Sequence, residues 1–303
     1  MTRVHIFGSL NADLVSYVDE LPKPGETRHG KRFLTAPGGK GLNQAIAAAR
    51  AGAEVSIVGA VGADNYGRWL IETAKVEGIE TDSVLEFGQH STGIALVSVD
   101  DRGENSIITI AGANLYADPN LLQISPGDIV LAQLETSIVS VLAAFRIAKE
   151  AGAITILNPA PATPIPTELL SLTDLLIPNE HEAAQISGID TNDDDGALAA
   201  ANALLGSGSK ACLITLGARG ALLVNADGAF FQPAFKTDPL DTTAAGDAFC
   251  GAFAAALASG ESQKSALSFA AAAGSLATTV EGAVPSLPNK DAILGLLQGQ
   301  KMP

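Results

Sequence analysis

Short apolar runs alternate with longer segments of helical periodicity along most of the 303-residue chain, and this rhythm constrains the fold more than any other feature. Within residues 41–51, for example, Leu42, Ala45 and Ile46 mark one apolar helical face. Strands that alternate with helices form a mainly parallel sheet, which needs helices on both faces to bury it. We therefore expect an α/β fold with three layers. The runs that we interpret as buried strands are 4–7, 55–58, 129–132, 154–157, 175–177 and 211–216.

Two regions interrupt this rhythm and predict a small second sheet. Residues 14–33 are mostly polar and have no helical period, whereas residues 93–99 and 106–110 alternate like strands around a polar turn. A small sheet of this kind is suited to act as a lid over a ligand. We expect a single domain over residues 1–303, with an antiparallel β lid formed by about 11–35 and 89–112.

The charge balance limits the partners of the protein. Thirty-three acidic and 18 basic side chains give a net charge of −15 and a pI near 4.5. Such a field repels nucleic-acid phosphates and anionic lipid, so neither is expected as a partner. A small anionic ligand would need local help from a metal, a lysine or a helix N-terminus.

The apolar content, 47% of the residues, is sufficient for a large core. The longest uncharged apolar stretch, 248–259, is too short and too interrupted by glycine to cross a bilayer. The run at 4–7 is too brief for a signal peptide, because polar Asn11 and Asp13 follow it at once. Cys212 and Cys250 lie inside apolar runs, where a buried reduced thiol is expected. We expect a cytoplasmic protein.

The segment 241–247 has the composition of a ligand-binding turn, because small residues precede an apolar helix that we expect to begin at residue 248. The first backbone N–H groups of this helix would then be open to an anion, which the helix dipole also favours. Asp247, beside this anion hole, is suited to accept a proton from a hydroxyl that attacks a phosphoryl group. An acidic residue that only stabilises the first helical turn is the alternative interpretation.

A second glycine-rich segment, 36–45, allows the backbone to approach a ligand closely. Lys40 and Asn43 would project polar groups from the start of the following helix. The segment is neither a phosphate-binding loop ending in Gly-Lys-Ser/Thr nor a Gly-x-Gly-x-x-Gly fingerprint. A tight turn between a loop and a helix explains the glycines equally well.

Polar residues also follow several predicted strands, where open α/β sheets gather their ligands. Carboxylates and amides at these places are suited to accept hydrogen bonds from sugar hydroxyls, although each residue alone also fits a helix cap or a turn. The segment 215–220 fits either a nucleotide-binding loop or a plain turn. The strand-end residues are Asn11, Asp13, Glu135, Asn179 and Glu182.

Taken together and in order, these segments resemble the ribokinase-like (PfkB) sugar kinases over essentially the full length of the chain. Nine motifs carry the resemblance, and their shared order makes it far more specific than any one of them. The motifs are 8–13 (GSLNAD), 24–27 (PGET), 38–45 (GGKGLNQA), 111–114 (AGAN), 133–135 (QLE), 158–162 (NPAPA), 178–182 (PNEHE), 215–220 (TLGARG) and 241–247 (DTTAAGD).

The resemblance implies a ribokinase-like three-layer fold and transfer of the ATP γ-phosphoryl group to the 5-hydroxyl of D-ribose. It implies Asp247 as the base and Ala244, Ala245 and Gly246 as the anion hole. The residues implied to hold the sugar are Asn11, Asp13, Gly39, Lys40, Asn43 and Glu135. The residues implied to line the nucleotide site or to organise its phosphates are Asn179, Glu182, Thr215, Gly217, Ala218, Gly220, Gly246 and Ala271.

The same resemblance implies Mg²⁺, held by Glu182 through water, and an activating monovalent cation, usually K⁺. Asp241 would hold K⁺ through its side chain, and several of the other residues through main-chain carbonyls. The positions implied for K⁺ are Asp241, Thr243, Ala277, Val280, Gly282 and Ser286. An open edge of the lid sheet is suited to pair with a second chain, so a homodimer through the lid is also expected.

Two positions depart from the family pattern. Relatives often have His or Asn at the position of Ala271, beside the adenine, so an alanine removes a hydrogen bond and puts the nucleotide preference in doubt. Relatives often have a basic residue at Val280, which matters little where only a main-chain carbonyl is used.

Several other functions compete with this one. Another kinase of the family, for 2-deoxyribose, fructose or a nucleoside, differs in few contacts, although an aromatic content of 5% offers little to cradle a base. A sugar-binding regulator without activity is a second alternative, but it would be expected to have lost Asp247 or Gly246. A dinucleotide oxidoreductase lacks its glycine fingerprint after the first strand.

Overall fold

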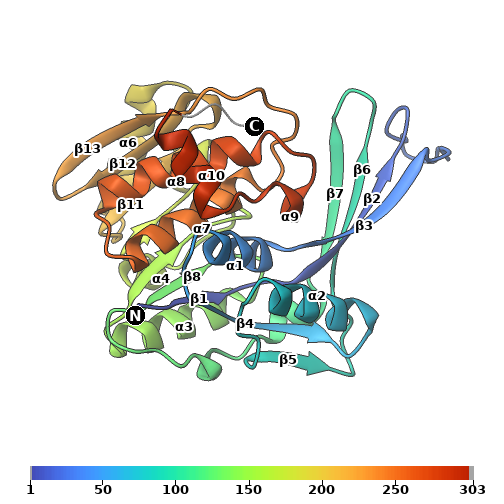
Figure 1. The fold of residues 1–303 in the computed structure, drawn as a ribbon, viewed down its shortest axis with the longest axis horizontal. Coiled ribbons are helices and arrows are strands. Elements are labelled where there is room, and N and C mark those ends of the chain that lie inside the picture. Colours follow the sequence, from blue (N-terminus) through green and yellow to red (C-terminus); the bar gives the residue numbers. More distant parts are fainter. Residues whose placement is uncertain (1, 300–303) are drawn as a thin grey trace.

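A nine-stranded sheet forms the centre of the protein in the computed structural model, which describes residues 2–299 (Figure 1). The strand order is β13-β12-β11-β10-β9-β8-β1-β4-β5, and every pair is parallel except β11–β12 and β12–β13. The strands are β1 Val4–Phe7, β4 Val55–Gly62, β5 Val84–Phe87, β8 Ile129–Ala132, β9 Ile154–Leu157, β10 Leu175–Leu176, β11 Ala211–Thr215, β12 Gly220–Asn225 and β13 Gly228–Pro233. The predicted mainly parallel sheet is therefore confirmed, and β4 continues four residues beyond its apolar run (58 to 62).

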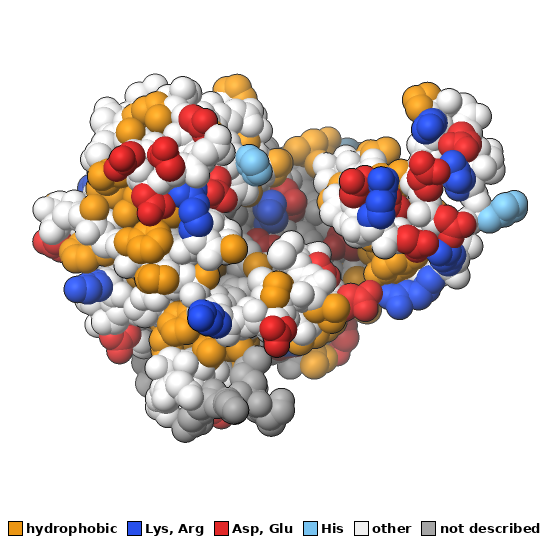
Figure 2. All heavy atoms as spheres, turned by 90° about the horizontal axis from the view of Figure 1, so that it is seen from above, with side chains coloured by type: hydrophobic (Ala, Val, Ile, Leu, Met, Phe, Trp, Pro, Cys, Tyr) orange, Lys and Arg blue, Asp and Glu red, His pale blue; other side chains and the backbone are white. Residues whose placement is uncertain are grey.

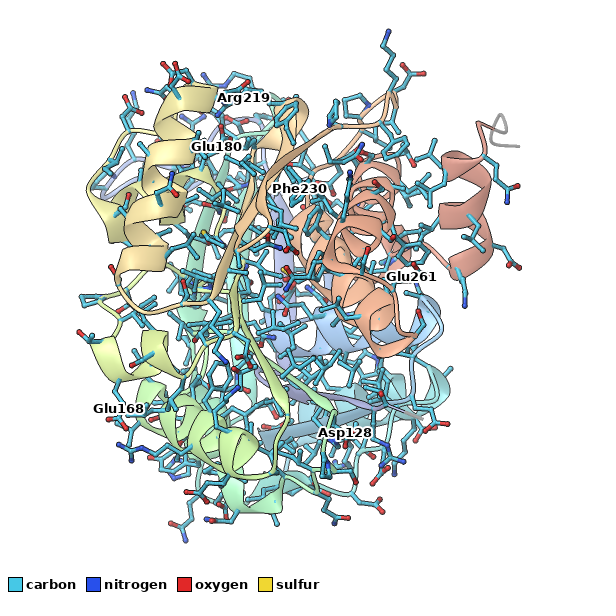
Figure 3. All side chains as sticks on the ribbon, turned by 90° about the vertical axis from the view of Figure 1, so that its left-hand side faces the viewer. Asp128, Glu168, Glu180, Arg219, Phe230 and Glu261 are labelled. Carbon is cyan, nitrogen blue, oxygen red and sulfur yellow. The ribbon has the colours of Figure 1, made fainter. Side chains whose placement is uncertain are left out.

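Helices cover both faces of this sheet, as the three-layer prediction requires (Figure 3). Neighbouring residues of one strand point to opposite faces: Ile6 packs in one apolar cluster with α1, α2, α7, α8 and α10, and Phe7 packs in the other with α3 to α6. The helices are α1 Lys40–Arg50, α2 Asn65–Val76, α3 Ile138–Glu150, α4 Thr167–Ser171, α5 Glu180–Ser187, α6 Asp194–Gly206, α7 Ala245–Ala258, α8 Gln263–Ala277, α9 Ala283–Ser286 and α10 Lys290–Leu297. Three short 3-10 turns lie at Gly112–Tyr116, Pro119–Leu121 and Gly217–Arg219.

The second sheet projects from the main body as a lid (Figure 1). Its order is β3-β2-β6-β7. The strands are β2 Asn11–Tyr17, β3 Arg32–Gly38, β6 Gly93–Val99 and β7 Asn105–Ile110. The pairs β2–β3 and β6–β7 are antiparallel, as in the predicted lid, while the central pair β2–β6 runs parallel.

The lid is anchored to the main sheet at its base. There the Asp64 carboxylate, which caps α2, accepts hydrogen bonds from both the backbone and the hydroxyl of Thr92, just before β6. Among the described residues, no helix is both long and apolar enough to cross a membrane.

Candidate active site

A hollow separates the lid from the main body, and basic and acidic side chains lie on its floor (Figure 2). Here β1 leads into β2 through Gly8, Ser9 and Leu10, and the glycine-rich segment ends β3 and begins α1. Two of these glycines are required by close packing. A Cβ at Gly41 would lie 2.4 Å from the backbone nitrogen of Ser9, and a Cβ at Gly39, whose φ is 88°, would lie 2.7 Å from that of Asn11. The glycines therefore let the backbone of β2 and α1 meet at the site.

The N-terminus of α7 presents free backbone donors. Ala244 has φ 59° and is the one described non-glycine residue with a positive φ, and it turns the chain into a helix that begins at Ala245. The N–H groups of Gly246 and Asp247 make no hydrogen bond to any described residue. The helix begins three residues before the start at 248 that the apolar run predicts, and this places Asp247 inside the first turn, where the dipole favours negative charge.

The Asp247 side chain is buried and held by two amides. Asn43 Nδ2 donates to Asp247 Oδ2 at 3.0 Å, and Gln44 Nε2 donates to Asp247 Oδ1 at 2.9 Å. Both amides project from the first turn of α1, which packs against α7. Asn43 Oδ1 is buried and has no partner among the described residues, so an acceptor next to Asp247 is left for a ligand hydroxyl.

A second carboxylate, Glu135, organises the other side of the hollow. Its Oε2 accepts from the Ser9 hydroxyl at 2.5 Å, from the Lys40 backbone N–H at 3.0 Å and from Asn11 Nδ2 at 3.4 Å. Asn114 fixes Asn11, because its Nδ2 donates to Asn11 Oδ1 at 2.7 Å while its own Oδ1 accepts from the backbone of Leu10. Glu135 Oε1 makes no hydrogen bond within the described chain.

Asp13 is half-buried, and its carboxylate has no hydrogen-bond partner among residues 2–299. Gly38 crosses directly over it, since an added Cβ there would lie 2.2 Å from Asp13 Oδ2. Burial, followed by the charges of Glu135 and Asp247, raises the pKa of Asp13 to about 7. A carboxylate in this state favours a ligand that donates hydrogen bonds to it.

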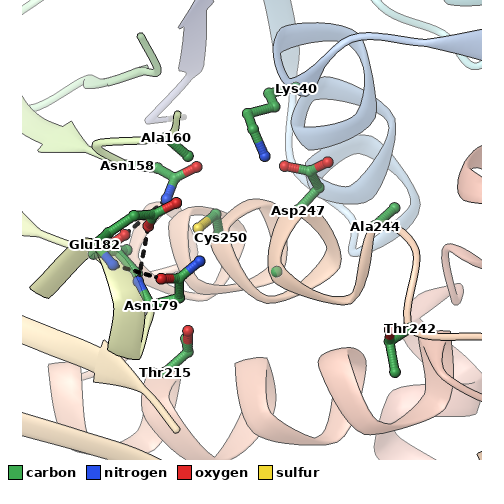
Figure 4. Close-up of a pocket in the computed structure, with 12 residues that line it drawn as sticks. Lys40, Asn158, Ala160, Asn179, Glu182, Thr215, Thr242, Ala244, Asp247 and Cys250 are labelled. Atoms are coloured by element: carbon green, nitrogen blue, oxygen red, sulfur yellow. Dashed lines mark hydrogen bonds between the residues drawn. The ribbon is translucent and has the colours of Figure 1, made fainter. Parts of the chain in front are cut away.

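The Lys40 ammonium and the Asp247 carboxylate point into one cavity of about 210 Å³ (Figure 4). The charge of Asp247, more than any other, raises the pKa of Lys40. On the far wall, Asn179 and Glu182 form a capping box at the start of α5, with both hydrogen bonds at 2.8 Å. Burial raises the pKa of Glu182, whose Oε1 has no described partner. The cavity is lined by Lys40, Asn158, Ala160, Ile177, Asn179, Glu182, Thr215, Thr242, Ala244, Gly246, Asp247 and Cys250.

A larger cavity of about 470 Å³ adjoins the first. Thr215, Thr242 and Gly246 line both cavities, so the free N–H of Gly246 lies where the two meet. Among the residues that sequence analysis assigned to the nucleotide, the larger cavity contains Thr215, Gly217, Ala218, Gly220, Gly246 and Ala271, and the smaller one contains Asn179 and Glu182.

The residues expected to bind the cation lie in the loop before α7 and between the end of α8 and the end of α9. Asp241 Oδ1 accepts from the backbone and hydroxyl of Thr243 at 2.9 and 2.7 Å, and Oδ2 accepts from Gly282 N–H at 2.8 Å. Although burial acts against them, these hydrogen bonds lower the pKa of Asp241. Ala277 ends α8, Ser286 is buried in α9 and donates to Ala283 O, and Val280 is 42% exposed. None of the six residues lines either cavity.

Sequence reasoning gave no role to four residues that the structure brings to the site. Gln44 and Asn158 are hydrogen-bonded to each other, and Gln44 is bonded to Asp247. Asn114 fixes Asn11, as described above. Cys250, expected only as a buried thiol, is buried and reduced but also lines the smaller cavity, one helical turn after Asp247. Helical spacing from Asp247 would have indicated Cys250. The other three lie in the motifs 38–45, 111–114 and 158–162, but their roles depend on contacts between distant segments.

Comparison with known proteins shows which family the chain resembles. The model of the pfkB family carbohydrate kinases matches residues 1–290. The chain is 40% identical over 309 residues to a bifunctional ribokinase/ribose-5-phosphate isomerase A of Fructilactobacillus sanfranciscensis, covering 100% of this chain and 57% of that protein. It is 39% identical to a ribokinase of Haemophilus influenzae, covering 97% of each chain. A solved structure of Arabidopsis thaliana ribokinase complexed with ribose and ATP superposes with a TM-score of 0.90 at 35% identity, covering 98% of this chain and 99% of the other.

Proposed function

Because the chain belongs to the pfkB family of carbohydrate kinases, we propose that it transfers the γ-phosphoryl group of ATP to the 5-hydroxyl of D-ribose. One observation carries this proposal: the buried Asp247 carboxylate lines the smaller cavity next to Gly246, whose free N–H lies where the smaller and the larger cavity meet. A phosphoryl donor in one cavity and an acceptor hydroxyl near Asp247 would be aligned there.

In the proposed reaction the sugar oxygen attacks the γ-phosphorus and the bond to the β,γ-bridging oxygen breaks, so that ribose 5-phosphate and ADP form. The Asp247 carboxylate accepts the hydroxyl proton. The N–H groups of Ala244 and Gly246 stabilise the charge on the transferred group. The N–H of Ala245, also expected in the anion hole, instead donates to Thr242 O at 3.2 Å. Closure of the lid excludes water and so limits hydrolysis of ATP.

The unpartnered acceptors around the hollow support a polyhydroxyl ligand. Asp13, Glu135 Oε1 and Asn43 Oδ1 all lack described partners that a sugar hydroxyl would supply. A charged donor, the Lys40 ammonium, lies near Asp247 and Glu135, whose charges raise its pKa. The residues that we propose to hold the sugar are Asn11, Asp13, Gly39, Lys40, Asn43 and Glu135.

The larger cavity is proposed to hold the nucleotide, with Thr215, Gly217, Ala218 and Gly220 along one wall and Ala271 against the base. Mg²⁺ fits beside it, since the free Oε1 of Glu182 is the hard oxygen donor that this ion prefers. Mg²⁺ would neutralise charge on the phosphates. Reduced, buried cysteines and the use of ATP agree with a cytoplasmic location.

We also propose a monovalent cation, such as K⁺, at the group of Asp241, Thr243 and Gly282. The oxygen-rich donor set fits: carboxylate, hydroxyl and main-chain carbonyls, with the pKa of Asp241 lowered so that it stays ionised. Such an ion would order the loop that leads into Ala244 without touching a substrate. The remaining proposed ligands are Ala277, Val280 and Ser286.

Replacing Asp241 should remove this dependence on the cation. We expect Asp241→Asn to lower kcat roughly 5- to 20-fold in K⁺ buffer, because the loop before α7 loses its ordering charge. The variant should respond little when K⁺ is replaced by a bulky organic cation, whereas the parent enzyme should lose activity. Steady-state rates in the two buffers measure this, and an undiminished response of the variant to K⁺ would contradict the site.

The open edge of the lid supports a homodimer. All six residues of β7 are exposed, including Ile107, Ile108 and Ile110. An edge strand with one unpaired side and exposed apolar side chains is an unusual surface for a monomer. We propose that two chains associate through this face.

The substrate is tested by a panel of sugars. We expect kcat/KM with ATP to be highest for D-ribose, at least about tenfold above 2-deoxyribose, because each lost hydroxyl leaves a buried acceptor unpaired. Fructose and nucleosides should be poorer still. Phosphorus NMR of the product should show a phosphate on C5. Equal or faster turnover of 2-deoxyribose would make that sugar the substrate, and no turnover of any sugar would favour a regulator that only binds.

A further inference from the structure

A chain of buried amides leads from the sheet to Asp247, and Gln44 is its last member. Gln44 is fully buried in α1. Its Nε2 donates to Asp247 Oδ1 at 2.9 Å and to Asn158 Oδ1 at 3.0 Å, so both amide hydrogens are used. Its Oε1 accepts from Gln133 Nε2 at 2.6 Å. Gln44 therefore has every hydrogen-bonding group engaged with protein.

A backbone carbonyl fixes which atom of each amide in this series is the donor and which is the acceptor. Asn158 Nδ2 donates to Ile177 O at 2.8 Å, and a carbonyl oxygen can only accept. Asn158 must therefore turn Oδ1 toward Gln44, which in turn must present Nε2. A flipped Gln44 amide would set its oxygen against two oxygens, one of them the carboxylate of Asp247. The amide that faces Asp247 is thus held as a donor.

We propose that Gln44 is a positioning residue that orients the Asp247 carboxylate and keeps it ionised for proton transfer; the inference rests on the proposed role of Asp247 as the base. The carboxylate is buried at 6% exposure, and the acidic residues Asp13 and Glu182, the Cys250 thiol and the Lys40 ammonium surround it. In such surroundings a hydrogen bond from a neutral donor favours the charged form.

Gln44 and Asn43 donate to different oxygens of the Asp247 carboxylate and differ in what they leave for a ligand. Asn43 donates to Oδ2 and keeps one unpaired, buried acceptor, Oδ1, for a substrate hydroxyl. Gln44 has no group left for a ligand, and it does not line either cavity. Its removal should therefore affect kcat and its pH dependence, whereas sugar binding should hardly change.

Two variants of Gln44 test this in opposite ways. Gln44→Met keeps the volume and removes the donor; we expect kcat to fall roughly 10- to 100-fold and the acidic limb of the kcat–pH profile to move upward by about one unit. Gln44→Glu donates only while protonated, so kcat should decline at alkaline pH, where the two carboxyl groups repel each other. In both, the dissociation constant for ribose, measured by calorimetry, should stay within about threefold of the parent value.

A double variant separates this role from a merely structural one. In the Asp247→Asn background, Gln44→Met should lower kcat by less than about twofold, because there is no longer a base to position. A full additional loss in that background, or an unmoved pH profile in both single variants, would overturn the inference. Retention of kcat by Asp247→Asn alone would instead overturn the proposed base. Thermal melts identify any variant that fails to fold, and either single variant suffices for the pH test.

Discussion

Asp247→Asn is expected to lower kcat by about 10²- to 10⁴-fold while ribose binds almost as well as before. The asparagine has nearly the shape of the aspartate but cannot accept the hydroxyl proton. It also replaces one acceptor by an amide that faces the donor of Asn43 or Gln44, so about 1–3 kcal/mol of folding stability should be lost. Steady-state kinetics and calorimetry with ribose measure the two effects separately.

A matched control tests the alternative, that Asp247 is only a first-turn acid. Asp291 occupies the first turn of α10, is exposed and lies outside both cavities. Asp291→Asn should leave kcat unchanged and alter stability by no more than about 0.3–1 kcal/mol, the usual effect of the helix dipole. If Asp247→Asn behaved in the same way, or raised only KM, Asp247 would not be the base.

Asp13→Asn should give the second large effect, an increase of about 10²-fold in KM for ribose with a smaller change in kcat. The carboxylate has no described protein partner, so its hydrogen bonds are available to the sugar, and an amide offers one acceptor atom where the carboxylate offers two. Because the pKa is raised to about 7, KM for ribose in the parent enzyme should also rise as the pH falls below 7. An unchanged KM in the variant would remove Asp13 from the sugar site.

The same substitution should stabilise the ligand-free protein at alkaline pH. The carboxyl has a pKa of about 7 in the folded protein against an ordinary value of 3.8, so between these values the folded state binds a proton that the unfolded state lacks. Stability is therefore lost as the pH rises through this window. We expect Asp13→Asn to gain about 2–4 kcal/mol at pH 8 and nothing below pH 4. Urea unfolding at both pH values checks the sign, and a loss at pH 8 would contradict it.

Local sequence patterns were sufficient for the parts of the fold that depend on neighbours in the chain. The strand boundaries of β1, β6, β8 and β9 match the apolar or alternating runs to the residue. The parallel pairing of β2 with β6 could not be predicted in this way, because alternation identifies a strand but not its partner about 80 residues away. The start of α7 was missed for a different reason: Ala244 adopts a left-handed conformation that alanine does not favour by itself.

The same distinction between local features and long-range contacts applies to the candidate site. Asp247 and the small residues before it could be found from one segment, since a helix start and its donors are local features. Gln44 and Asn158 lie 114 residues apart, and Gln44 lies 203 residues before Asp247. Their hydrogen bonds arise only when α1 packs against α7 and the sheet.

A crystal structure with ribose and a non-hydrolysable ATP analogue would test the central claim most directly. We predict that the ribose 5-hydroxyl oxygen lies within about 2.6–3.2 Å of an Asp247 carboxylate oxygen. The terminal phosphate should lie against the backbone N–H of Gly246. A 5-hydroxyl directed away from Asp247, or a triphosphate that does not reach the start of α7, would contradict the mechanism.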